Sequence, residues 1–232
     1  MGKKRKYIKE VEEEVIDDSE ETDSSPRLDL EALFGSAADE DEGPKIRTIS
    51  LYGEVTEEIA AEIVYSLHII NQLRLTERQE LSDPEDIDSE LVTVNDPLEL
   101  LISTHGGSAP EMFAIYDMIR LTRKQTEVCT IGIGKVMSAG VLLLASGTKG
   151  QRKIAKNCRV MIHSVIAASH GSIHSLEAEM DEIRYLQERH IDCLVEETDM
   201  TKRYLKKLMD KKVNVYLTAE EAVDLGIADE II

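Results

Sequence analysis

A serine, a histidine and a pair of glycines in this chain could together hydrolyse an amide bond. Nucleophilic hydrolysis by serine needs a hydroxyl, a base within hydrogen-bond reach to take its proton, and N–H donors to stabilise the tetrahedral oxyanion. Ser138 could supply the hydroxyl and His163 could supply the base. The turn at Gly106-Gly107 and the N–H of Ala139 could supply the donors.

The residues around Ser138 indicate how the chain would position it. Val128 to Ile133 is a short apolar, β-prone run, and it is followed by G-K-V-M-S-A-G-V-L-L-L-A-S-G. This pattern predicts a buried strand, a tight turn and a buried helix whose first turn contains Ser138. The unpaired N–H groups and the dipole of that helix would favour negative charge on a bound group. A serine in this position is usually only an N-cap, so its partners must decide.

His163 and the glycine pair each follow a predicted strand. Asn157 to Ile162 is β-prone and ends at His163, and Leu98 to Ser103 runs into T-H-G-G. Two glycines after a buried strand indicate a backbone with positive φ, or one that another group approaches closely. Taken alone, a strand-end histidine usually has a structural role and a Gly-Gly pair is usually a simple turn.

Strand-like runs and helical patterns alternate along residues 46–232. One helical pattern starts at Thr56, another buries Met112, Ile115, Tyr116 and Ile119, and Thr218 to Glu221 is a capping box for a short last helix. The alternation predicts an α/β domain with a mainly parallel sheet. A further pattern from about Ile173 to Glu197 predicts a helix longer than such a core needs. A projecting helix of this kind usually packs against another subunit.

Most of the formal net charge of −19 lies in two segments. Residues 1–45 contain 15 acidic and 7 basic residues, and residues 76–97 contain 8 acidic residues and one basic residue. The composition of residues 1–45 predicts a largely disordered tail, because it cannot bury enough apolar surface to offset the entropy of ordering. Residues 76–97 contain Pro84 and Pro97 and read as an acidic surface loop inserted into the domain.

The chain offers little support for nucleic-acid, membrane or metal chemistry. Outside the first six residues no basic stripe could neutralise phosphates, and no apolar run approaches the length of a membrane span. With no apolar segment behind the basic N-terminus, we expect a soluble cytoplasmic protein. The three cysteines are widely spaced among apolar neighbours, which favours reduced core residues. No cofactor motif is present, so we expect neither cofactor nor metal.

Five motifs occur in one order from about Lys45 to Ile232. They are G-E-V, I-S-T-H-G-G, I-G-x-x-x-S-A-G-x-L-L-L-A-S-G, N-x-R-V-M-I-H and Y-L-T-A-E-E-A-V-D-L-G-I-A-D. The series resembles the ClpP family of serine peptidases. The resemblance implies the ClpP/crotonase fold, a repeated β-β-α spiral, and rings of seven subunits stacked face to face as a tetradecamer around a proteolytic chamber. It also implies a cytoplasmic setting and an AAA+ unfoldase that feeds substrate into the chamber.

The same resemblance implies a role for each residue of the site. Ser138 matches the nucleophile and His163 the general base, while the backbones of Gly107 and Ala139 match the oxyanion hole. The long helix over about residues 173–197 matches the handle that joins two rings.

The sequence departs from the family pattern at the third triad position. Asn214 stands where the family usually has an Asp, so it could orient the imidazole of His163 without stabilising its positive charge. In a Ser-His-Asp triad, such an Asp-to-Asn change lowers kcat by about 10⁴. We therefore expect a weak or substrate-restricted peptidase. Asp210 could substitute for Asn214, although a solvated Asp at a helix end is the commoner role for such a residue.

Other departures concern the partners. T-H-G-G replaces the usual S-P-G-G, and the N-terminal loop that contacts the unfoldase has no clear match in residues 1–45. An unfoldase partner is therefore uncertain, and a self-contained processing peptidase, such as one that matures a viral capsid, is a reasonable variant. A catalytically silent ring subunit remains the main alternative, supported by Asn214. An acyl-CoA enzyme of the crotonase group is weaker, because it would not need Ser138 and His163.

Overall fold

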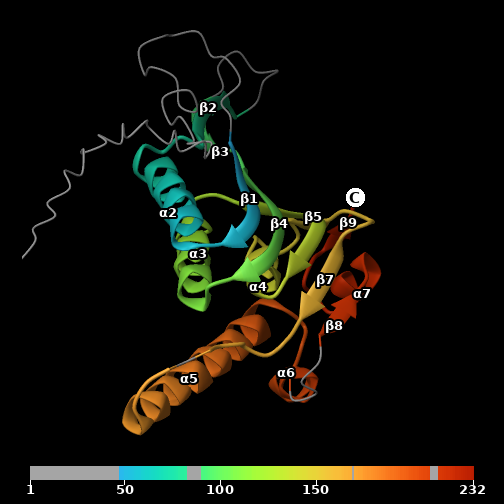
Figure 1. Ribbon diagram of the computed structural model, residues 1–232. Coiled ribbons are helices and arrows are strands. Elements are labelled where there is room, and N and C mark those ends of the chain that lie inside the picture. The colour runs from blue at the N-terminus through green and yellow to red at the C-terminus, as the bar shows by residue number, and fades with distance from the viewer. Residues whose placement is uncertain (1–46, 83–89, 169, 210–213) are drawn as a thin grey trace, which may run out of the picture. The chain divides into compact units, whose positions relative to one another are not determined.

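The computed structural model describes residues 47–82, 90–168, 170–209 and 214–232 (Figure 1). The predicted tail, residues 1–45, lies outside the described residues. The main sheet has the order β1-β4-β5-β6-β9, and β7 pairs with both β5 and β8. The strands are β1 Thr48–Val55, β4 Leu98–Gly107, β5 Val128–Met137, β6 Arg152–Ile154, β7 Arg159–Ile162, β8 Val215–Leu217 and β9 Glu230–Ile231. All neighbours are parallel except β7 and β8, so the predicted α/β class with a mainly parallel sheet is confirmed.

Six helices accompany this sheet in the described part of the chain. They are α2 Glu57–Gln72, α3 Ala109–Thr122, α4 Ala139–Ala145, α5 Ile173–Glu197, α6 Lys202–Met209 and α7 Ala219–Asp224. Thr56 caps α2 by accepting a hydrogen bond from the Ile59 N–H, and α2 packs against α3. The four residues predicted to be buried on α3 are all buried, because apolar side chains at this spacing share one helical face. The capping box of α7 at Thr218 is also confirmed.

The core lies between the sheet and the helices. Leu100 and Ile102 of β4 and Leu142, Leu143 and Leu144 of α4 are completely buried. α4 is therefore hydrophobic on every side, as is typical of a helix inside a core. Its position leaves its first residues beside the ends of β4, β5 and β7, which it also contacts.

The prediction of a tight turn between the strand and the serine was wrong. β5 continues to Met137, four residues beyond Ile133, and the chain changes direction at Ser138 itself. Lys135, Val136 and Met137 pair with β7. These three residues extend the strand because they gain sheet hydrogen bonds from β7, a partner that comes later in the sequence.

Residues 76–97 are not the irregular loop that their composition indicated. β2, Glu77–Leu81, and β3, Leu91–Asn95, form a two-stranded antiparallel sheet. Gln79 donates a cross-strand hydrogen bond to Thr93, and Arg78 pairs with Asp96. β2 is mainly charged and polar, while most apolar side chains of β3 are exposed, so the hairpin buries little apolar area and relies on its cross-strand pairs. Residues 83–89 between the strands lie outside the described part.

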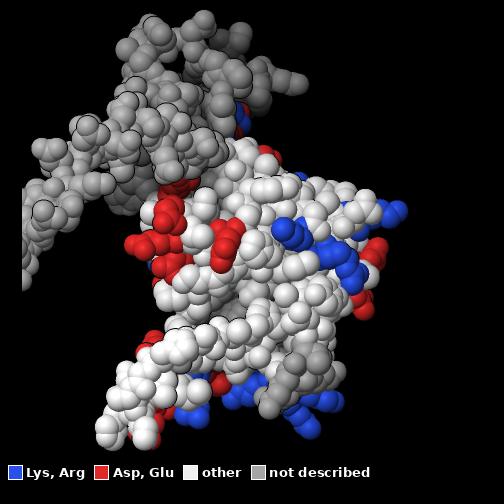
Figure 2. All heavy atoms as spheres, in the orientation of Figure 1, with Lys and Arg blue, Asp and Glu red and all other residues white. Residues whose placement is uncertain are grey.

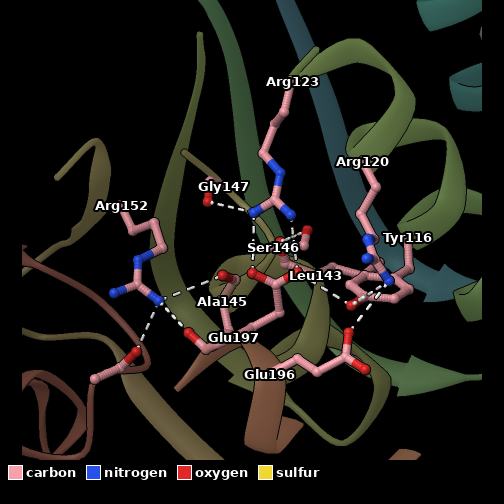
Figure 3. A network of polar contacts seen from close by, with 11 residues as sticks. Tyr116, Arg120, Arg123, Leu143, Ala145, Ser146, Gly147, Arg152, Glu196 and Glu197 are labelled. Carbon is pink, nitrogen blue, oxygen red and sulfur yellow. Dashed lines mark hydrogen bonds and ion pairs between the residues drawn. The ribbon is translucent and has the colours of Figure 1, made fainter. Parts of the chain in front are cut away.

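The long helix α5 has the predicted bounds and is anchored at its C-terminal end. Glu197 accepts hydrogen bonds from both terminal nitrogens of Arg123 and from the hydroxyl of Tyr116, at 2.8–3.0 Å. Its carbonyl accepts a hydrogen bond from buried Arg152 (Figure 3). By contrast, residues 173–182 are all exposed. Only about the last two turns of α5 are therefore packed in the core.

Candidate active site

Ser138 occupies a strained position between β5 and α4. Its φ of 54° and ψ of −120° lie outside the regions that residues with a side chain normally adopt. It stands at the N-cap position, yet its side chain makes no capping hydrogen bond. Its backbone N–H donates to the carbonyl of Met161 at 2.8 Å, which fixes the turn against β7. A non-glycine residue held in this conformation costs on the order of 1–3 kcal/mol and is characteristic of functional sites.

The register of β5 and β7 brings His163 to Ser138. The two strands are parallel, and Met137 pairs with Met161. Residues just past the ends of parallel strands emerge at the same edge of a sheet, so 138 and 163 are neighbours. The Nε2 atom of His163 lies 2.8 Å from Oγ of Ser138. With a proton on Nδ1, Nε2 can accept the hydroxyl proton.

The glycine turn at the end of β4 packs directly against Ser138. Gly106 has φ +100°, and a Cβ placed on it would lie 2.5 Å from Cβ of Ser138. Thr104 holds this turn, since its hydroxyl donates to the carbonyl of Gly53 at 2.5 Å and accepts from the N–H of Gly106 at 2.9 Å. Thr104 therefore has a structural function within T-H-G-G.

The two expected oxyanion donors directly follow Gly106 and Ser138 in the chain. Gly107 is the next residue after Gly106, which packs against Ser138, and Gly107 is exposed. Ala139 is the first residue of α4, where backbone N–H groups have no partner within the helix. Gly107 and Ala139 therefore stay the predicted oxyanion donors.

Asn214, the expected third member, does not contact His163. Its side chain is exposed, and His163 Nδ1 is buried without a hydrogen-bond partner in the described structure. Asp210 lies outside the described residues, as do residues 211–213, which precede Asn214. The structure thus brings together two of the three expected side chains.

A second histidine beside the pair was missed by the sequence reasoning. His190 on α5 is 7 % exposed, and its Nε2 atom is buried and also lacks a hydrogen-bond partner among the described groups. Burial, and to a lesser degree the charge of nearby His163, lowers the pKa of His190 to about 4. His190 is therefore neutral near pH 7. It lies four residues before buried Leu194, a spacing that could have placed it on the inner face of α5.

The described residues contain no group of three or more His, Cys, Asp or Glu side chains that could hold a metal ion. Cys129, Cys158 and Cys193 are free and buried, as predicted, and burial raises the pKa of each thiol. In the same ranges, no helix is both long and apolar enough to cross a membrane.

Basic side chains on α6 gather at the lower edge of the face drawn in Figure 2. Lys202 contacts Glu188 and Asp192 of α5, and Lys206 also contacts Glu188. These contacts offset part of the positive charge within the protein. The helix therefore does not form the continuous unpaired basic stripe that phosphate binding favours.

A family model described as Clp protease matches residues 87–232. The match covers more than half of the chain and includes Ser138, His163 and both glycines of the adjoining turn. It agrees with the mostly parallel sheet and with the close contact between serine and histidine. The chain belongs to the Clp protease family.

Proposed function

We propose that this protein is a ClpP-like serine endopeptidase in which Ser138 is the nucleophile and His163 is the general base. The observation that carries the proposal is the 2.8 Å separation of Ser138 Oγ and His163 Nε2. The strained backbone at Ser138 and the close packing of Gly106 support it independently.

In the proposed reaction Ser138 Oγ attacks the carbonyl carbon of a peptide bond while its proton passes to His163 Nε2. The N–H groups of Gly107 and Ala139 stabilise the negative oxygen of the tetrahedral intermediate. Nε2 then gives its proton to the leaving amine, and the C–N bond breaks to give an acyl-serine. A water molecule, deprotonated by His163, hydrolyses this ester and restores the hydroxyl.

The third position explains the expected low rate. Asn214 is proposed to orient His163 in a conformation in which its amide oxygen accepts the Nδ1 proton. An amide carries no negative charge, so it stabilises the imidazolium of the transition state less than the usual Asp does. Replacing Asn214 by Asp is therefore expected to raise activity.

The chamber is proposed to form by ring assembly, with seven subunits in each of two stacked rings. Exposed apolar side chains that share one face on the outer part of α5 support this assembly: Ile173, Leu176 and Met180. A helix face of this kind is typical of a subunit contact. Polypeptides are the proposed substrates, the cytoplasm is the proposed location, and an AAA+ unfoldase is a possible partner.

A catalytically silent ring subunit is the second candidate. The unpartnered Nδ1 of His163 and the exposed Asn214 favour it, because an unoriented imidazole is a poor base. Such a subunit would act through assembly or through regulation of an active relative.

A fluorophosphonate, which reacts covalently with activated serines, distinguishes these candidates. The peptidase is expected to be labelled at Ser138, and labelling should be lost in Ser138→Ala and in His163→Ala. Ser146→Ala is the matched control, because Ser146 is buried at the other end of α4 and its hydroxyl donates to Leu143. Absence of labelling on assembled wild-type particles would support the silent subunit.

A further inference from the structure

The Nδ1 atom of His163 takes no part in the contact with Ser138. Nδ1 is buried and has no hydrogen-bond partner among the described residues, although its proton must be held for Nε2 to act as a base. A buried polar atom left unpaired costs about 1–3 kcal/mol. The surrounding fold is therefore expected to supply an acceptor.

α5 runs past the segment that follows this histidine. The side-chain oxygen of Gln187 accepts a hydrogen bond from the N–H of Val165 at 3.2 Å, which holds the helix against that segment. His190 lies three residues further along, on the same face of the helix and about one turn away. α5 also packs against α4, the helix that Ser138 begins.

His190 presents the complementary group. Its Nε2 atom is buried and unpartnered in the described structure, and the charge of His163 acts on it. A neutral imidazole with its proton on Nδ1 has an acceptor lone pair on Nε2. One orphaned donor and one orphaned acceptor thus lie buried in the same part of the site.

Building on the proposed function, we propose that His190 is the positioning residue of the catalytic pair in the described conformation, where Asn214 makes no hydrogen bond to His163, and that His190 accepts the Nδ1 proton of His163. No direct hydrogen bond joins the two rings in the described conformation, so the contact is made through one bridging water or after a small ring rotation. Either arrangement fixes the tautomer of His163 that directs its Nε2 lone pair at Ser138. His190 then performs the orienting part of the missing Asp, without its negative charge.

The test measures the rate at which a fluorophosphonate labels Ser138 in the full-length assembled protein. His190→Met removes the acceptor at similar volume and is expected to slow labelling about 100-fold, the typical cost of a misplaced catalytic group. His190→Gln keeps an acceptor near the position of Nε2 and is expected to recover most of that loss.

Two controls separate positioning from structural damage. Ile191→Met changes a neighbouring buried side chain of α5 without altering a polar atom, and it should label like the wild type. Thermal melting and particle mass are measured for every variant, so that a folding defect is seen directly.

Two results would overturn the inference. They are an unchanged labelling rate in His190→Met, and equal slowing in His190→Met and His190→Gln. In each of these the wild type is still labelled, so the proposed peptidase survives. Absence of labelling in the wild type would instead remove the peptidase proposal and the role of His190 with it.

Discussion

Gly106 and Ser138 are packed so closely that position 106 has no room for a side chain. A Cβ at Gly106 would lie 2.5 Å from Cβ of Ser138 and 3.0 Å from its hydroxyl oxygen. Gly106 belongs to β4 and Ser138 directly follows β5, and these two strands are paired. The glycine thus sets the position of the serine as well as the direction of the turn.

Gly106→Ala is expected to reduce fluorophosphonate labelling by at least about 100-fold, because the added methyl group must displace Ser138. Gly150→Ala is the matched control: Gly150 has a similar φ of +89°, but a Cβ there meets nothing within 4 Å. Both variants carry the backbone cost of a positive φ, and only the first crowds the site. Equal labelling of the two would contradict this account.

Ser138→Gly is expected to be more stable than Ser138→Ala by about 1 kcal/mol. Glycine relieves the strain at φ 54°, and its greater freedom in the unfolded chain offsets part of the gain. Both variants lack the hydroxyl, so the comparison isolates backbone strain. Urea unfolding of the two proteins measures the difference, and a more stable alanine variant would show that the strain is absent.

Acid should destabilise the protein through His190. Its pKa is about 4 in the folded protein, against an ordinary value near 6.5, so between these values the unfolded chain binds a proton that the folded chain does not. The free energy of unfolding therefore falls as pH drops from about 6.5 to about 4, by up to about 3 kcal/mol from this group. In His190→Met, the free energy of unfolding measured across this pH range should fall less steeply with decreasing pH than in the wild type. An unchanged slope would mean that His190 is not held neutral.

Glu197→Gln is expected to lower the free energy of unfolding by about 3–5 kcal/mol, because it leaves the guanidinium of Arg123 without its buried counter-charge. Burial and the charge of Glu197 also raise the pKa of Tyr116, whose hydroxyl donates to the same carboxylate. The neighbouring Glu196→Gln is the control. Glu196 pairs with Arg120 at 3.3 Å near the surface, and exposed pairs contribute at most about 1 kcal/mol. Similar losses in both variants would argue against a special role for the buried pair.

The sequence was most informative where chemistry and local pattern coincide. Ser138 and His163 were expected to meet from their motifs, and α5 was expected with its observed bounds, because helical periodicity and capping are local properties. The continuation of β5 to Met137 was not foreseen, since it depends on pairing with β7, which comes later in the chain. Residues 76–97 were misread for the same reason: cross-strand contacts, rather than composition, make them a hairpin.

The position of His190 beside His163 could not be predicted from the sequence. Its spacing from Leu194 places it on the inner face of α5, but nothing in the sequence says that His163 is its neighbour. That proximity follows from how α5 lies against the segment after β7, through Gln187 and Val165. Asn214 shows the converse, because its motif position indicated a contact with His163 that the described conformation does not contain.

The helix α5 is held at its C-terminal end and exposed at its N-terminal end. Glu197 clamps its base to Arg123, Tyr116 and Arg152, whereas residues 173–182 extend into solvent. With a rise of 1.5 Å per residue, the whole helix of 25 residues is about 37 Å long. His190 lies about two turns before Glu197, between the fixed end of α5 and its exposed end. A partner that bound and bent the exposed end would therefore be expected to move the turn of the helix that carries His190.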